Sequence, residues 1–514
     1  MAGHTAIYGD RFSMMRGAVA SLSKGSKAQY YPSMPPKHDK YNPHRPVYDY
    51  KNLPLRNEHD YRETLEQLSN ANTKAARAKI TRDTGVSRMP LCMAMPAFLH
   101  PSFFPLDPFH LIYENCMAYL YDVWTVFSSP GEKMHLTTAK ARKFGRLVSE
   151  AVVTLPPVFS GPIRDPFLKR QSQYKIYEWM ALLHWYIIPI GTEIGFHPTV
   201  LANFAKFAEI ADFAMAIQPR SKEDLKQLHT LIAQFLKEYE RIYVGDDPEK
   251  VSRCRLCIMQ LIHIPTHIEW YGSIRLGSQA TVERAIGEIG RKVRSRKAPF
   301  ANVATIIYER ELLRLLLLHV PSLQPQTKDK PKRIFIKEVR ILKSDIKKPA
   351  SKINTYISAI CQYIGQSTNQ TPDLQQWAKH VLPNKHTLTS ELFESLSTLS
   401  NIRSSKFFEA TEEGSTIPIF GRAVAFFEVL ETAQKLVVFY PMINLKQSFN
   451  RWKGNWSPTI QVCSVSQIRH MVGVIQYEDR VHILRKHPGL SMLTPEELGI
   501  VDSSVELDTE PDDI

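Results

Sequence analysis

The sequence has few cysteines and no long apolar run. Six cysteines, at 92, 116, 254, 257, 361 and 463, are spread over 514 residues, which is typical of a reducing compartment rather than a disulfide-linked secreted protein. The opening residues MAGHTAIYGDRF lack the apolar core of a secretory signal. The most apolar stretch, 179–191, contains His184 and Pro189 and is too short to span a bilayer. We therefore expect a soluble intracellular protein with no membrane partner.

Glycine is also scarce, with 22 residues in the whole chain. The sequence contains no Gly-rich phosphate loop, no G-x-S-x-G turn and no H-E-x-x-H helix. These absences argue against P-loop and Rossmann proteins, serine hydrolases of the G-x-S-x-G type and zinc proteases of the H-E-x-x-H type. No small-molecule cofactor is expected.

What the chain has in excess is positive charge. It contains 65 Lys and Arg against 51 Asp and Glu, a net charge of +14 and a pI near 9.3. The last fourteen residues carry six acids and no base, so the remainder of the chain carries +20. Nine bases and three acids fall between 328 and 348. Such a surplus predicts a polyanionic partner, and without a membrane segment this partner is nucleic acid.

The patterning predicts a mainly α protein with an α/β part and a small β-rich C-terminal module. The expected regions are an irregular Tyr/Pro-rich segment at 1–60, an α/β part at 61–134, a large helical segment at 135–262, further helices at 263–320, a basic linker with helices at 321–400, a β-rich module at 401–490 and an acidic disordered tail at 491–514.

Two cysteines and two histidines have the spacing most suggestive of a metal site, in Cys254-x2-Cys257-x5-His263-x3-His267. On a continuous helix the two pairs would point about 130° apart, so one zinc could bind all four only if the helix broke between them. The other interpretation is two buried thiols and two helix histidines. We expect no structural zinc.

A helix at 279–294 carries an acid beside several bases. Glu283, Gly287, Arg291 and Arg294 fall on one face, next to an apolar stripe, and five of the seven residues 291–297 are basic. A carboxylate could hold a divalent cation while the arginines contact phosphates. A solvated charged face with an Arg284–Glu288 pair is the alternative.

The segment Leu106-Asp107-Pro108-Phe109-His110 places a carboxylate at an expected strand-to-helix junction. Asp is favoured as a helix N-cap and Pro at the first helical position, so Asp107 is either a cap or a functional carboxylate with His110 three residues on.

Three segments resemble DDE transposases of the CACTA (En/Spm-like) superfamily, in particular the fungal Plavaka-like group. They are PAFLHPSFFPLDPFHLIYENCMAYLYDVW around Asp107, the CRLCIMQLIHIPTHIEWYGSIRLGSQATVERAIGEIG stretch from Cys254, and IFGRAVAFFEVL with VHILRKHPGL near the C-terminus. Glu283, Arg284 and Gly287 match an E-R-x-x-G motif of that family.

The resemblance implies an RNase H-like core interrupted by a helical insertion, here 135–262. It also implies three acidic ligands for two Mg²⁺ or Mn²⁺ ions that support phosphodiester hydrolysis and strand transfer. By motif, Asp107 is the second acid and Glu283 the third. The expected DNA-contacting residues are Arg284, Arg291, Lys292, Arg294, Arg296 and Lys297.

The first acid of the family has no counterpart upstream of GHTAIYGDRF, and the cysteine knuckle usual near Asp10 is absent because no Cys precedes residue 92. Asp10, Asp39 and Asp49 are weak substitutes. We therefore expect a truncated or domesticated transposase, nuclear, inactive alone, and compatible with a homo-oligomer. A non-catalytic DNA-binding protein and a protein-interaction scaffold are the alternatives.

Overall fold

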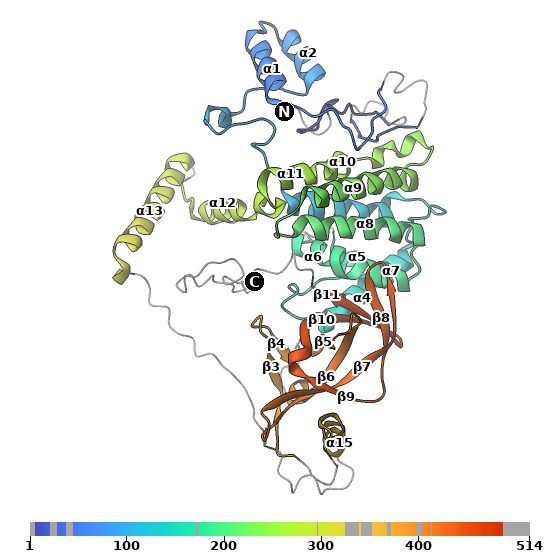
Figure 1. Cartoon of the computed structure of the whole chain (residues 1–514). Coiled ribbons are helices and arrows are strands. Elements are labelled where there is room, and N and C mark those ends of the chain that lie inside the picture. Colours follow the sequence, from blue (N-terminus) through green and yellow to red (C-terminus); the bar gives the residue numbers. More distant parts are fainter. Residues whose placement is uncertain are drawn as a thin grey trace. The chain divides into compact units, whose positions relative to one another are not determined.

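The computed structural model describes residues 6–20, 28–36, 45–170, 174–295, 297–323, 339–340, 352–366, 372–396, 403–412 and 414–486 (Figure 1). The chain divides into two compact units. Unit 1 comprises 1–119 and 246–336, and unit 2 comprises 120–245 and 337–514. No helix in the described part of the chain is long and apolar enough to cross a membrane.

Unit 1 consists of helices and irregular segments. Its helices are α1 (Glu58–Asn70), α2 (Lys74–Thr84), η1 (Leu91–Ala94), η2 (Phe109–Met117), η6 (Pro248–Arg253), α10 (Leu256–Gln260), η7 (Leu261–His263), α11 (Ile264–Tyr271), η8 (Ile274–Gly277), α12 (Ala280–Lys292), α13 (Pro299–His319) and η9 (Pro321–Leu323), with α3 (Ala118–Asp122) following η2 at the junction with unit 2.

The described part of 1–60 is irregular, as predicted, up to the start of α1. Two isolated β-bridges, Ser13 with Leu55 and Ala18 with Tyr30, are its only β-structure in the described residues. This segment is nevertheless well buried, since Met15 and Tyr31 are 0% exposed. It is therefore part of the core of unit 1 and not a loose arm.

The α/β character predicted for 61–134 is wrong, because the described residues there form helices and turns without a strand. Residues 101–106, expected to end a strand before Asp107, form turns. Pro101, Pro105 and Pro108 lack the N–H that a strand ladder requires. The described residues of unit 1 do not confirm an RNase H-like core, which needs a central sheet.

The helix α12 matches the predicted 279–294, and α13 lies within the region 263–320 where further helices were predicted. None of the described side chains of either helix is buried: Val282 and Ile286 of the α12 apolar stripe are 58% and 63% exposed, and Phe300 of α13 is 88% exposed. Arg310 of α13 contacts Glu288 of α12 at 3.2 Å. The expected Arg284–Glu288 pair is therefore replaced by a contact between the two helices.

Unit 2 contains residues 135–245 of the helical segment predicted at 135–262, and the remaining residues, 246–262, belong to unit 1. The helices of unit 2 are η3 (Val123–Phe127), α4 (Thr138–Ala151), η4 (Val152–Thr154), α5 (Pro166–Lys169), α6 (Ile176–Ala181), η5 (Leu182–Tyr186), α7 (Ile187–Glu193), α8 (Pro198–Met215), α9 (Lys222–Tyr243), α15 (Lys352–Ile364) and α16 (Glu391–Leu396). Aromatic side chains fill the space between them, and Trp124 donates a hydrogen bond from Nε1 to Tyr243 at 2.9 Å.

The C-terminal part of unit 2 is an antiparallel sheet. Its strands, with a short two-stranded sheet of β3 and β4, are β1 (Val339–Arg340), β2 (Leu374–Trp377), β3 (Lys379–Val381), β4 (Thr387–Thr389), β5 (Phe407–Thr411), β6 (Pro418–Val429), β7 (Gln434–Ser448), β8 (Arg451–Trp456), β9 (Gln461–Ser464), β10 (Ile468–Tyr477) and β11 (Arg480–Arg485); η10 (Val465–Gln467) lies between β9 and β10.

Six of these strands pair in a closed ring, β6–β5–β10–β11–β8–β7 and back to β6 (Figure 1). A cluster of inward side chains comes from all six strands: Phe407, Phe420, Met442, Trp452, Trp456, Val472, Val474, Val481 and Ile483. The ring is therefore a small barrel with a packed apolar interior. The sequence predicted this β-rich module.

The sheet begins earlier than the sequence predicted, because β2 pairs with β6 through Leu374 opposite Val429. This strand lies in the region 321–400, for which the sequence predicts a basic linker with helices. The buried residues of β2 are Leu374 and Gln376, which alternate as in a strand. Because one of these two residues is a glutamine, the sequence does not show the alternation of apolar and polar residues that identifies a strand. Most of the basic linker, 324–338 and 341–351, and the acidic tail lie outside the described residues.

Candidate functional site

Asp107 is held at the start of η2, a π-helical segment. Its Oδ1 accepts hydrogen bonds from the backbone N–H of Phe109 at 3.0 Å and of His110 at 3.4 Å. Pro108 follows it, where the missing N–H costs nothing. The N-cap interpretation of Asp107 is thus confirmed, and the cap fixes the direction of the carboxylate.

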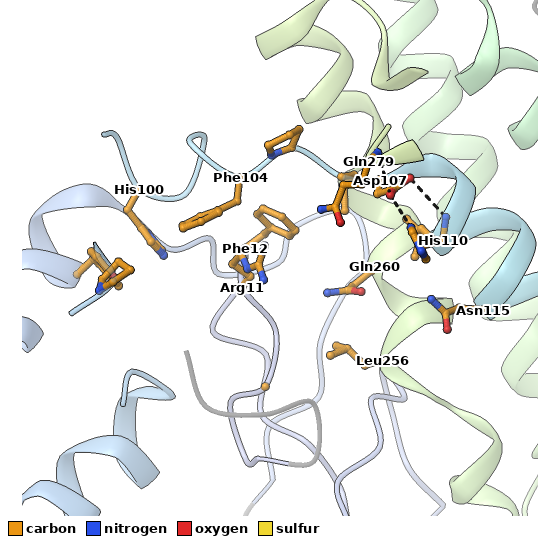
Figure 2. Close-up of a pocket in the computed structure, with 16 residues that line it drawn as sticks. Arg11, Phe12, His100, Phe104, Asp107, His110, Asn115, Leu256, Gln260 and Gln279 are labelled. Atoms are coloured by element: carbon orange, nitrogen blue, oxygen red, sulfur yellow. Dashed lines mark hydrogen bonds and ion pairs between the residues drawn. The ribbon is translucent and has the colours of Figure 1, made fainter. Parts of the chain in front are cut away.

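The second oxygen of Asp107 points away from the helix. Asp107 Oδ2 lies 2.5 Å from Nδ1 of His110, and it accepts a hydrogen bond from the backbone N–H of Gln279 at 3.2 Å (Figure 2). Gln279 immediately precedes α12, the helix that carries Glu283. This bond joins two parts of unit 1 that the whole helical segment separates in the sequence.

His110 completes the connection to Glu283. Its Nε2 lies 3.2 Å from Oε1 of Glu283 and 3.3 Å from Oε2 of Glu114. One imidazole ring therefore contacts three carboxylates, one through Nδ1 and two through Nε2. The structure brings together the predicted residues Asp107 and Glu283, and it adds Glu114, which the sequence analysis missed.

The acids around His110 favour its protonated form. Partial burial lowers the pKa of the imidazole, but the hydrogen bond and charge of Asp107, together with the charges of Glu114 and Glu283, raise the pKa above 6.5 overall. When protonated, the ring carries a positive charge among three carboxylates, of which Glu283 is 54% exposed.

The donor set would suit a divalent ion, because Mg²⁺ and Mn²⁺ prefer carboxylate oxygens. Its geometry does not fit two bound ions. Both oxygens of Asp107 already accept hydrogen bonds, and the His110 ring stands between Asp107 and Glu283. When His110 is protonated, its own side chain is the cation that lies among these acids.

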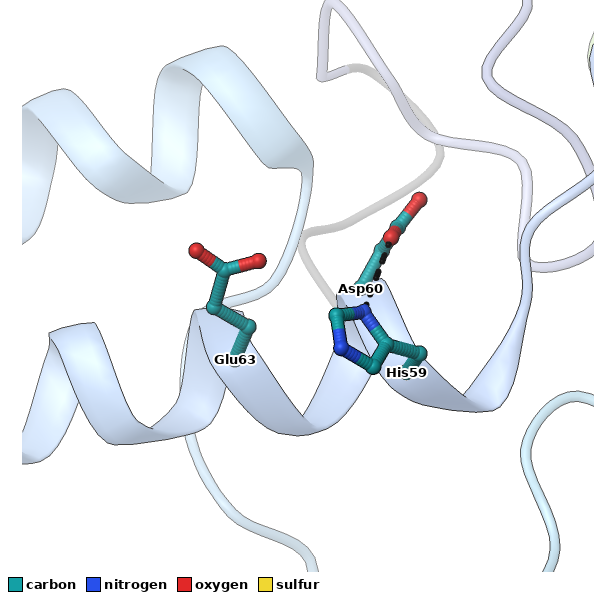
Figure 3. Close-up of side chains that lie close together, drawn as sticks. All are labelled: His59, Asp60 and Glu63. Atoms are coloured by element: carbon teal, nitrogen blue, oxygen red, sulfur yellow. Dashed lines mark hydrogen bonds and ion pairs between the residues drawn. The ribbon is translucent and has the colours of Figure 1, made fainter.

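The described residues contain one compact group of potential metal ligands, and it lies elsewhere. His59, Asp60 and Glu63 of α1 offer ligand atoms within 4.8 Å of one another (Figure 3). All three side chains are exposed, and exposed acidic groups commonly occur without an ion. This cluster does not include any residue assigned by the family motifs.

Asp10, a weak candidate for the first acid, is instead a buried structural carboxylate. It is 0% exposed and accepts hydrogen bonds from Ser13 N at 2.8 Å and Gln260 Nε2 at 3.1 Å, and His263 Nε2 lies 2.9 Å away. Burial raises its pKa, but the charge of His263 and these hydrogen bonds together lower it to about 2. Asp49 lies in an exposed turn, and Asp39 falls outside the described residues.

The two histidines of the zinc-like motif have different hydrogen-bond partners, although the Phe12 ring lies against both. His263 contacts Asp10, while His267 accepts a hydrogen bond at Nδ1 from the Leu106 N–H at 3.3 Å. Cys257 accepts a hydrogen bond at its carbonyl oxygen from the Cys116 thiol. These contacts agree with the interpretation of buried thiols and helix histidines.

A cavity of about 520 Å³ opens beside the Asp107–His110 pair, entirely within unit 1 (Figure 2). Sixteen residues line it: Gly9, Arg11, Phe12, Tyr61, Pro90, His100, Phe104, Pro105, Leu106, Asp107, His110, Leu111, Asn115, Leu256, Gln260 and Gln279. Polar groups of both charges therefore meet aromatic rings around one space, as is usual for ligand sites.

The predicted DNA-contacting residues lie on and after α12. Arg284, Arg291 and Lys292 are exposed on the helix, and Arg294 and Lys297 are exposed just beyond it. Arg296 lies outside the described residues. An added Cβ at Gly287 would meet no atom within 4 Å, so this part of the backbone is open to an approaching ligand.

Some site residues carry a sequence signal and others do not. Asp107, His110 and Glu114 are spaced i, i+3 and i+7, a pattern that puts side chains on one helix face and could have identified Glu114. Arg11 and His100 come from irregular segments, where no periodic pattern predicts their meeting.

No protein-family model and no curated protein sequence matches this chain.

Proposed function

We propose that this chain derives from a DDE transposase of the CACTA superfamily, Plavaka-like group, and binds DNA without cutting it on its own. The supporting observation is the contact of Asp107 and Glu283 with one imidazole. The family motifs assign these two acids as metal ligands, although a long helical segment separates them in the chain. Chance would rarely bring together two residues selected in this way.

In this proposal unit 1 corresponds to what remains of an RNase H-like core, and residues 135–262 correspond to its helical insertion. The metal-binding chemistry is lost because His110 occupies the space between the acids and both Asp107 oxygens are engaged. A complete site would need both divalent ions to stabilise the attacking and leaving oxygens of the phosphodiester.

The DNA-binding face is α12 and the residues after it. Five described cations, Arg284, Arg291, Lys292, Arg294 and Lys297, are exposed there, beside the open backbone of Gly287. Each phosphate contact by such a cation releases counterions, which makes the affinity strongly dependent on salt. The expected place of action is the nucleus.

Two assays test this function. Filter binding of duplex DNA between 50 and 200 mM salt should show affinity falling steeply with salt and little preference for sequence. Incubation of supercoiled plasmid with Mg²⁺ or Mn²⁺ should give no nicking above background. A flat salt profile would remove DNA as the partner, and nicking that both Asp107→Ala and Glu283→Ala abolish would show an active nuclease.

Protein association is the second candidate function, favoured by α13. Apolar residues occur on all sides of this helix, among four charged residues at 309–311 and 314, yet none of its residues is buried, and Phe300, Tyr308 and Leu318 are at least 65% exposed. Helices of this kind are normally covered by another surface. Light scattering of the purified chain detects a homo-oligomer, and a pull-down combined with the salt titration separates a protein scaffold from a DNA-binding protein.

A further inference from the structure

The cavity beside Asp107 has the size and walls of a site for a small planar ligand. Its volume of about 520 Å³ lies within the usual range of roughly 300–1,000 Å³ for ligand sites. Such a space can hold one nucleotide but not a stacked duplex. Phe12 and Phe104 contribute ring surface to the lining, and Asn115 and Gln260 contribute amide groups (Figure 2).

His100 supplies the strongest evidence that the cavity binds a ligand. Its side chain is 4% exposed, and neither ring nitrogen has a hydrogen-bond partner among the described residues. One face of the imidazole stacks on Tyr61, with ring centroids 3.8 Å apart and an interplanar angle of 9°. An unsatisfied buried polar group costs about 1–3 kcal/mol, so a partner for these nitrogens is expected.

The protonation state of His100 indicates what that partner is. Burial, together with the charge of Arg56, lowers the pKa of the imidazole to about 4. The ring is therefore neutral near pH 7 and offers one N–H donor and one acceptor nitrogen. A ligand edge that can donate or accept a hydrogen bond matches it, whereas a simple anion does not.

Arg11 supplies a cation to the cavity, whereas the His100 ring is neutral. Its guanidinium lies 4.8 Å from the centroid of the Phe104 ring, and it makes no hydrogen bond or ion pair with any part of the chain that the structure describes. This contact holds the guanidinium over the ring and leaves its N–H groups available. Arginine in this state is suited to a phosphate, which it can bind through two parallel hydrogen bonds.

We propose that this cavity binds one nucleotide, with its base among the ring side chains and against His100 and its phosphate on Arg11. The proposal rests on the proposed DNA-binding function where the nucleotide belongs to a DNA strand, whose base must then leave the stack. The same chemistry would accept a free nucleotide. Unstacking costs a few kcal/mol, which contacts with aromatic side chains and the base edge can offset.

Fluorescence of 2-aminopurine tests the nucleotide in a strand, because this base is quenched when stacked and brightens when unstacked. Saturating binding of a short DNA duplex carrying 2-aminopurine should raise its emission several-fold with the full chain. Phe104→Ala, Arg11→Gln and His100→Phe should each remove most of the rise. Arg82→Gln, at an exposed position outside the cavity, should leave the rise unchanged.

His100→Phe retains the stacking on Tyr61 and removes only the ring nitrogens, but its burial makes it the variant most at risk of misfolding. Arg11 is exposed, so Arg11→Gln tests the cavity without disturbing the core. Circular dichroism of each variant identifies any that has unfolded. Filter binding of the same duplex reports DNA affinity independently of the fluorescence.

Equilibrium dialysis with dAMP tests the free nucleotide. Binding of dAMP that Arg11→Gln and His100→Phe both weaken by tenfold or more supports the nucleotide site, even where the duplex does not bind and the proposed function fails. DNA binding without a change in 2-aminopurine emission and without dAMP binding overturns the nucleotide site and leaves the DNA-binding function standing. Absence of all three signals overturns both.

Discussion

Asp107 and Glu283 lie on opposite sides of a single imidazole, at 2.5 Å from Nδ1 and 3.2 Å from Nε2 of His110. The two acids come from segments on either side of the large helical segment, so the contact is a property of the fold and not of local sequence. A protonated ring at this position stabilises carboxylates that would otherwise repel one another. The contact between the two acids and the ring therefore depends on the protonation of His110.

The titration of His110 should report this contact directly. Its pKa is raised above 6.5 by Asp107 first and then by Glu114 and Glu283, so Asp107→Asn and Glu283→Gln should each lower it, Asp107→Asn more. NMR of the imidazole Hε1 resonance measures both changes. Replacement of Glu63, an exposed acid of α1, by Gln should leave the titration unchanged. Equal titration in all variants would contradict the geometry.

The same shift sets a pH window for stability. A group whose pKa is higher in the folded state stabilises that state fully below the unfolded value, here 6.5, and this contribution is lost as the pH rises through the higher folded value. Thermal melting of the wild type should therefore lose stability above about pH 6.5 more than His110→Gln does. A variant that follows the wild-type curve throughout this window would show that His110 is not linked to folding.

Removal of the His110 ring should open the site to a metal ion. In His110→Ala, Asp107 Oδ2 and Glu283 lose their shared cation, and carboxylate oxygens become available to Mn²⁺. We expect Mn²⁺ affinity to rise by about tenfold, a change of about 1.4 kcal/mol. Electron paramagnetic resonance of free Mn²⁺ measures it, with His319→Ala as the exposed control. Unchanged affinity would show that His110 does not compete with an ion.

The buried Asp10–His263 contact predicts sensitivity to acid. The pKa of Asp10 falls from 3.8 to about 2, so its contribution of about 2 kcal/mol is present above pH 3.8 and lost as the pH falls toward 2. Asp10→Asn should destabilise unit 1 by about 3 kcal/mol at pH 7, because it leaves a buried histidine without its carboxylate. Urea unfolding measures this loss, and exposed Asp49→Asn should cost less than about 0.5 kcal/mol.

Periodic patterns account for what the sequence could predict. Helical spacing identified α12 and α13 and the helices of 135–262, and alternation identified the barrel strands, because one buried face imposes a period on each element. The N-cap of Asp107 followed from residue type alone. The connection between Asp107 and Glu283 needed the family motifs, since no local pattern specifies a contact across so long an interval.

Aperiodic segments account for what the sequence could not predict. Arg11 and His100 reach the cavity from stretches whose backbone follows prolines and turns, and tertiary contacts alone fix their direction. The prediction of a strand before Asp107 is wrong because prolines lie on both sides of the apolar run Phe103-Phe104. Apolar residues there pack against α1 and not into a sheet.

The cations on α12 and just after it should account for much of the salt dependence of DNA binding. Combined Arg291→Ala, Lys292→Ala and Arg294→Ala should lower the slope of log affinity against log salt by about 2 to 3, since each phosphate contact contributes about 0.9. The matched control is Lys74→Ala, Lys79→Ala and Arg82→Ala, three exposed cations of α2. Equal losses in both triple variants would indicate general attraction by net charge instead of a defined face.

The substitution Gly287→Ala should change helix stability and DNA affinity in opposite directions. An added Cβ there meets nothing within 4 Å, and Ala is favoured over Gly inside a helix, so Gly287→Ala should stabilise α12 by about 0.5–1 kcal/mol. DNA that approaches the backbone of the Glu283–Arg291 face would meet the new methyl group, so affinity should fall while stability rises. Gly290 also has open space, and at 100° per residue it lies about 20° from Glu283 on the same face, so Gly290→Ala should give the same stabilisation and also lower the affinity. Filter binding and thermal melting of the two variants measure both quantities, and unchanged affinity in both would place the DNA on another surface.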